Sequence, residues 1–94
     1  MAANSKTAYV DFKISVGGSE TEIKIFETEN AVFVYVNQHP QEMHLYSDPL
    51  KAILQRDCKN MGNKEFSVLC NLSKHECLED IAKEIVTRLS SYTE

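Results

Sequence analysis

The sequence predicts an α+β fold, in which an antiparallel β-sheet carries two helices on one face and leaves its other face available for dimerisation. The first observation is the alternation of apolar and polar residues in successive short segments, which is typical of strands. The second is a pair of segments with one apolar stripe at helical spacing. The predicted order is four strands, a helix, a strand and a helix. With 94 residues, the chain has room for one domain, which we place at residues 8–94 behind a flexible tail at residues 1–7.

The first two strands are predicted to form a hairpin. Apolar residues occupy every second position of Ala8–Val16. Gly17-Gly18 follows and supplies the positive φ angles of a tight hairpin turn. The return strand runs from about Glu20 to Glu27, with Ile23 and Ile25 directed inward.

The third predicted strand, Ala31–Val36, is apolar on both of its faces. A strand of this composition must be covered on both faces. Asn37-Gln38-His39-Pro40 has the composition of a turn, and Glu42–Tyr46 fits a short fourth strand. Short turns between sequential strands predict an antiparallel meander.

The remaining elements are two helices around a fifth strand. Ser47-Asp48-Pro49 predicts a helix start, and apolar residues then recur at helical spacing from Leu50 to Met61, with Gly62-Asn63 as the end. Phe66–Leu72 alternates again as a strand. Ser73-Lys74-His75-Glu76 matches a capping box before a last amphipathic helix. The apolar stripe of that helix consists of Cys77, Leu78, Ile81, Ala82, Ile85, Val86 and Leu89.

Two helices with one stripe each cover only one face of a five-stranded sheet. We predict that large apolar residues on the other face form a protein interface: Phe26, Phe33, Tyr35 and Leu69. On the same face they are mixed with polar residues, namely Asp11, Lys13, Lys24 and Ser67. Burying one large apolar side chain is worth ~1.5–3 kcal/mol, and a contiguous exposed patch usually marks a partner site. Strand twist and lysine stems could instead shield these residues, but the doubly apolar third strand favours a partner sheet packed face to face.

Composition argues against several classes of protein. Ten Lys plus Arg against fourteen Asp plus Glu give a net charge of −4, whereas a nucleic-acid-binding domain carries clustered cations. No apolar run has membrane-spanning length. The first residues lack the apolar core of a secretory signal, so we expect a cytoplasmic protein with reduced cysteines.

No arrangement of residues predicts catalysis. Cys58, Cys70 and Cys77 lack metal-ligand spacing and fall on predicted buried positions. His75 precedes Cys77 closely, but side chains of near neighbours in sequence diverge, which disfavours a nucleophilic pair. His39 and His44 are expected at the surface. We therefore expect no catalytic residue, no metal and no cofactor.

Several of these segments resemble the proteasome assembly chaperone 4 family. The similarity covers roughly Tyr9 to Tyr92 and is closest in Ala31–Val36 and in Phe66–Leu72, the latter preceded by Gly62-Asn63-Lys64. The resemblance implies a small, non-enzymatic chaperone that pairs with a related subunit, assembly chaperone 3, or with itself, and dimerises through its sheet. Such a pair holds α subunits of the proteasome core particle while their ring is built.

This chain departs from the family pattern in one place. Only Ser47-Asp48 separates the fourth strand from the first helix, where a longer excursion is expected. Two other functions stay open at this stage: a general adaptor domain of an unrelated pathway, and a small enzyme or ligand-binding domain with a cleft beside the helices.

Overall fold

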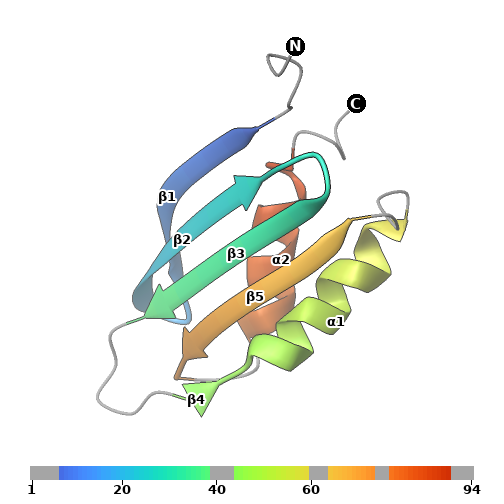
Figure 1. Ribbon diagram of the computed structural model, residues 1–94. Coiled ribbons are helices and arrows are strands. Elements are labelled where there is room, and N and C mark those ends of the chain that lie inside the picture. Colours follow the sequence, from blue (N-terminus) through green and yellow to red (C-terminus); the bar gives the residue numbers. More distant parts are fainter. Residues whose placement is uncertain (1–6, 39–43, 60–63, 74–76, 90–94) are drawn as a thin grey trace.

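The computed structural model describes residues 7–38, 44–59, 64–73 and 77–89. They form a five-stranded sheet with both helices on one face (Figure 1). The strands are β1 (Ala8–Val16), β2 (Ser19–Glu27), β3 (Ala31–Gln38), β4 (His44–Leu45) and β5 (Glu65–Leu72). The helices are α1 (Ser47–Asp57) and α2 (Leu78–Val86). The predicted α+β class and element order are confirmed.

The β1–β2 hairpin forms as the sequence predicts. Gly17 and Gly18 both have positive φ angles, 61° and 82°. A two-residue turn of this kind matches the right-handed twist of the strands that it joins. Pairing runs without interruption from Val16 opposite Ser19 to Ala8 opposite Glu27. The turn therefore fixes which residues of β1 share a face with which residues of β2.

The predicted meander is wrong for the fourth strand. The sheet order is β1-β2-β3-β5-β4, so β5 lies beside β3 and runs parallel to it. β4 has only two residues and pairs antiparallel with the end of β5. The longer β5 supplies a full row of partners for β3, which the short β4 cannot. The segment containing β4 and α1 then serves as the crossover that a parallel pair requires.

Two residues predicted in a turn instead end β3. Asn37 and Gln38 are both buried, while His39 and Pro40 lie outside the described residues. The Gln38 Nε2 donates hydrogen bonds to the Val16 carbonyl at 3.2 Å and to the Thr21 hydroxyl at 2.9 Å. Its Oε1 accepts from the backbone N–H and the hydroxyl of Ser73, at 3.0 and 3.1 Å. Burial is tolerated because both ends of the amide are bonded.

The helix boundaries differ from the predicted caps. α1 starts at Ser47 as predicted, although the Ser47 hydroxyl accepts the Cys70 backbone N–H at 3.0 Å and does not cap the helix. The helix ends at Asp57, with Cys58 as its C-cap, before the predicted end at Met61; Met61 and Gly62-Asn63 themselves lie outside the described residues. The N-cap of α2 is Cys77 and not Ser73, since Ser73 is engaged by Gln38. Residues 74–76 of the predicted capping box are not described.

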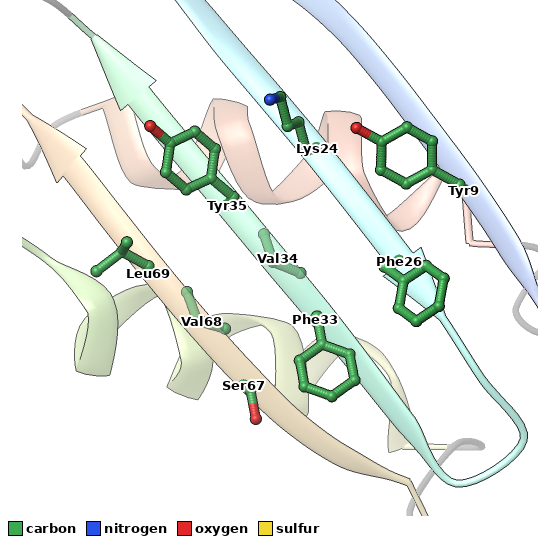
Figure 2. A pocket seen from close by; sticks show the side chains of 9 residues that line it. All are labelled: Tyr9, Lys24, Phe26, Phe33, Val34, Tyr35, Ser67, Val68 and Leu69. Atoms are coloured by element: carbon green, nitrogen blue, oxygen red, sulfur yellow. The ribbon is translucent and has the colours of Figure 1, made fainter.

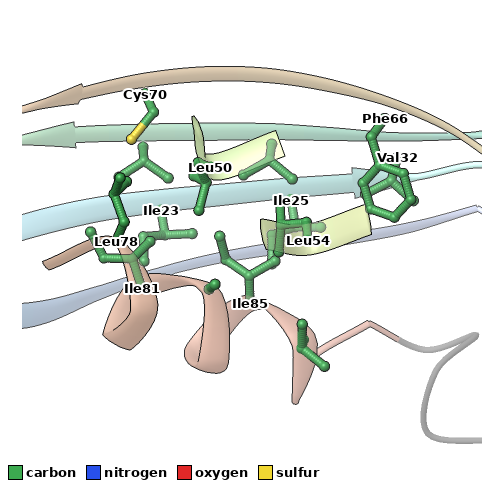
Figure 3. Packing of buried hydrophobic residues seen from close by; sticks show 14 of the residues in the cluster. Ile23, Ile25, Val32, Leu50, Leu54, Phe66, Cys70, Leu78, Ile81 and Ile85 are labelled. Atoms are coloured by element: carbon green, nitrogen blue, oxygen red, sulfur yellow. The ribbon is translucent and has the colours of Figure 1, made fainter. Parts of the chain in front are cut away.

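The core lies between the sheet and the two helices (Figure 3). Its most completely buried large residues include Ile23 and Ile25 of β2, Leu50 and Leu54 of α1, and Ile85 of α2. Ile23 and Ile25 point to the helical side of the sheet, as the alternation in the sequence predicts, and the buried residues of α1 and α2 pack against them. In the described part of the chain, no helix lies over the opposite side.

One ion pair lies at the end of the sheet where β2 ends and β5 begins. The Lys64 Nζ lies 2.9 Å from Glu27 Oε2 and donates to the Thr28 carbonyl at 2.7 Å. The side chains of Lys64 and Glu27 are only 13% and 3% exposed. This buried pair ties the loop before β5 to the hairpin strand β2.

Candidate protein-binding face

The uncovered side of the sheet carries five large side chains that lie together, which we call the apolar face: Tyr9, Phe26, Phe33, Tyr35 and Leu69 (Figure 2). The register places them in two adjacent rows across the strands. Tyr9 lies opposite Phe26, which lies opposite Phe33. In the next row Tyr35 lies opposite Leu69.

Four of these side chains are exposed in spite of their size, and Tyr35 is half-buried. The exposed fractions are 57% for Tyr9, 39% for Phe26, 45% for Phe33 and 46% for Leu69. The ring centroids of Phe26 and Phe33 are 6.0 Å apart. Together the five residues line a shallow hollow of about 310 Å³, so the surface has relief into which another side chain could pack.

Polar groups border the apolar face on one side. The Lys24 Nζ lies 5.7 Å from the centre of the Tyr35 ring and 3.5 Å from Glu22 Oε2. The Glu22 carboxylate is the main reason that the pKa of Lys24 is raised. In the row beyond, Asn71 donates a hydrogen bond from Nδ2 to Asn37 Oδ1 at 3.3 Å. The open side of the sheet is therefore apolar over one half and polar over the other.

The structure brings all four predicted interface residues together and adds one that the prediction omitted. The predicted interface does not include Tyr9, which alternates with the inward residues of β1. The signal was present in the sequence: a two-residue turn at Gly17-Gly18 sets Val16 opposite Ser19, and counting outward then sets Tyr9 opposite Phe26. Leu45 of β4, 67% exposed, is a second large apolar residue that was not predicted at the surface.

The cysteines behave as core residues or near-core residues. Cys58 and Cys70 are buried, and Cys77 is partly buried. Burial raises the pKa of the Cys70 thiol to about 12 and is the main cause of the raised pKa of Cys58. Thiols held protonated in this way are poor nucleophiles at neutral pH.

The other candidate groups do not assemble into a chemical site in the described part of the chain. His44 is exposed on β4 as predicted, while His39 and His75 lie outside the described residues. Among the residues that are described, no three His, Cys, Asp or Glu side chains come together as metal ligands would. Neither α1 nor α2 has the length and apolar content that crossing a bilayer requires.

Two arginines of the helical side form ion pairs within the chain. Arg56 forms ion pairs with Asp57 at 2.9 Å and with Glu79 of α2 at 3.1 Å. Arg88, just after α2, forms an ion pair with Glu84 at 2.7 Å. The Arg56 contact joins α1 to α2, and the Arg88 contact ties the residues after α2 to its last turn.

Comparison of the chain with protein-family models, with curated proteins and with solved structures returns no match. The apolar face and the resemblance in sequence are therefore the grounds for a function.

Proposed function

We propose that this protein is a non-enzymatic, protein-binding subunit that associates with its partner through the apolar face. The observation that supports this is the group of five large side chains on the sheet side that has no helix over it. Each large apolar side chain that a partner buries contributes roughly 1.5–3 kcal/mol. Aromatic residues such as Tyr9, Phe26, Phe33 and Tyr35 are also the type enriched at the centre of interfaces.

The size of the apolar face indicates what kind of partner it needs. Strand spacing and the repeat along a strand give about 33 Å² per position on one side of a sheet, so the five positions of the apolar face cover about 165 Å². A stable interface buries about 800 Å² on each partner. The apolar face thus supplies the centre of an interface, and the partner must also cover the polar half of the sheet. A second sheet packed face to face has the required extent.

In its specific form, the proposal is a cytoplasmic assembly chaperone of the proteasome core particle. The resemblance to the proteasome assembly chaperone 4 family supports it, and the partners would be a related small subunit, similar to assembly chaperone 3, and proteasome α subunits. A homodimer through the same face is the alternative partner arrangement. The chaperone would act by differential binding: tight to a partly built α ring and weak once further subunits arrive.

The test is affinity capture of the full chain from cells of its own source, followed by mass spectrometry. The wild type is compared with Phe33→Asp, which places a charge in the middle of the apolar face. The matched control is Ala52→Asp, which places the same charge at an exposed position of α1 on the other side of the molecule. We expect the related subunit and α subunits with the wild type and the control, and at least a tenfold loss with Phe33→Asp.

Two results would contradict separate parts of the proposal. Equal recovery with Phe33→Asp would show that the apolar face is not the interface. Recovery of neither α subunits nor a related subunit would rule out the chaperone, and capture of an unrelated protein through Phe33 would favour a general adaptor.

A further inference from the structure

The outer edge of β1 has no strand beside it in the described part of the chain. β1 is the first strand in the sheet order and pairs only with β2. It is nine residues long, contains no proline, and its register with β2 has no bulge. Long, regular edges of this kind are templates for pairing with another strand, which is why most proteins interrupt or shorten them.

The hairpin turn decides which backbone groups point to this edge. A two-residue turn makes Val16 and Ser19 a hydrogen-bonded pair, and such pairs alternate along an antiparallel ladder. Val10, Phe12 and Ile14 therefore direct their N–H and C=O groups toward β2. The residues between them, together with Tyr9 and Ser15, direct theirs outward.

The charges of β1 are complementary to those of a second, antiparallel β1. Asp11 and Lys13 lie on either side of Phe12, which is the central residue of Ala8–Val16. If two copies pair about a two-fold axis at Phe12, Asp11 of each copy lies opposite Lys13 of the other. Opposite charges at directly facing positions stabilise a strand pair, and like charges destabilise it.

The same charges exclude the neighbouring registers. A shift of two residues in one direction places Asp11 opposite Asp11, and a shift in the other direction places Lys13 opposite Lys13. A shift of one residue sets outward backbone groups opposite inward ones and loses the hydrogen bonds. One register therefore satisfies both the backbone and the charges, and it is also the register that pairs all of β1.

The incomplete burial of the β1 side chains that face the helices is consistent with an edge that has no strand beside it. Val10, Phe12 and Ile14 are only partly buried, although they point to the same side as the fully buried Ile23 and Ile25 of β2. We propose that two copies of this chain pair antiparallel through their β1 edges, centred on Phe12, to form one continuous sheet. This pairing would cover the exposed parts of the three side chains.

Edge pairing and the apolar face are independent of each other. The two-fold axis of an edge-paired dimer runs perpendicular to the sheet, so the apolar faces of both copies stay open on the same side. A partner that binds the apolar face could then find two such faces next to each other. The inference does not rest on the proposed function.

Two charge reversals test the pairing with the full-length chain. In Asp11→Lys, two lysines face each other across the dimer, and in Lys13→Asp, two aspartates do. Each variant alone is expected to raise the dimer dissociation constant at least tenfold in sedimentation experiments, relative to the wild type. In an equimolar mixture of the two variants, every lysine faces an aspartate again, so a mixed dimer of wild-type affinity is expected in native mass spectrometry.

Controls separate edge pairing from folding and from the apolar face. Asp11 accepts a hydrogen bond from the Tyr9 hydroxyl at 3.4 Å and Lys13 lies 3.6 Å from Glu20, so circular dichroism must show that each variant is folded. Asp48→Lys and Lys59→Asp make the same reversals at exposed positions away from β1 and should dimerise like the wild type.

The outcomes that would overturn the inference are distinct from those that concern the proposed function. A wild type that stays monomeric in the millimolar range would overturn the edge pairing, as would a mixture of the two variants that fails to dimerise. If Phe33→Asp abolishes the dimer and Asp11→Lys does not, the dimer forms through the apolar face. The edge pairing would then be wrong and the proposed function would stand.

Discussion

Replacing Gln38 by leucine should destabilise the fold strongly, although the change is nearly isosteric and makes the residue more apolar. Gln38 is 1% exposed, and its amide makes four hydrogen bonds that link β1, β2 and the residue after β5. Leucine removes all four and leaves the part-buried N–H of Ser73 without this acceptor. An unsatisfied buried donor costs ~1–3 kcal/mol and each further lost bond ~0.5–1.5 kcal/mol, offset in part by the burial of the leucine.

We therefore expect Gln38→Leu to lower the free energy of unfolding by about 2–4 kcal/mol. A 94-residue domain has a total of only about 5–14 kcal/mol at the usual value per residue. The measurement is urea unfolding followed by circular dichroism at one fixed protein concentration, since self-association adds to the apparent stability. Gln55→Leu makes the same chemical change at an exposed position of α1 and should change the free energy little. If the free energy of unfolding of Gln38→Leu stays within about 0.5 kcal/mol of the wild type, the hydrogen bonds of Gln38 to β1, β2 and Ser73 do not stabilise the fold.

Three further changes test other features of the fold. Gly17→Ala should lower the free energy of unfolding in urea more than Gly18→Ala. Both positions need a positive φ, which costs alanine ~1–2 kcal/mol, but a Cβ at Gly17 would also lie 2.9 Å from the Sγ of the α2 N-cap residue. Equal losses for the two variants would show that the chain relieves this contact without cost. Ile85→Asp should leave the chain unfolded by circular dichroism, since it puts an unpaired charge at a fully buried position, whereas Lys83→Asp at an exposed position of α2 should fold. Burial raises the pKa of the Cys70 thiol to about 12. The thiol of the unfolded chain therefore ionises first, so the free energy of unfolding should fall as pH rises from about 9 towards 12, by up to ~1.4 kcal/mol per pH unit. In Cys70→Ala, the free energy of unfolding should depend less on pH over this range. An unchanged slope would show that burial does not hold the Cys70 thiol protonated.

Local patterns in the sequence were sufficient to predict most strands and both helices. The double glycine fixed the hairpin register, and the period-two alternation identified the side of β2 and β5 on which each residue lies. The same alternation placed Phe26, Phe33 and Leu69 on one side of the sheet, and the structure shows all three facing away from the helices; that they form an interface stays a prediction. Tyr9 was missed because its row becomes visible only when the register is counted from the turn.

What the sequence did not reveal depends on contacts between distant segments. The parallel pairing of β3 with β5 follows from competition between β4 and β5 for one edge, and no local pattern expresses that competition. The burial of Gln38 is a similar case, because its partners come from three different parts of the chain. Polar residues at the end of a strand have the composition of a turn unless such partners are known.

The parallel seam between β3 and β5 has a consequence for the newly made chain. The pairs β1–β2 and β2–β3 join strands that are close in the sequence and can form as soon as they are synthesised. The pairing of β3 with β5 begins at Ala31 and Glu65 and cannot form until Glu65 has been synthesised. At 5–20 residues per second, the roughly 34 residues between them take about 2–7 s to translate. During that interval the apolar strand β3 has one edge without its partner, which is the period in which the nascent chain is most exposed to aggregation and most in need of protection by the cell.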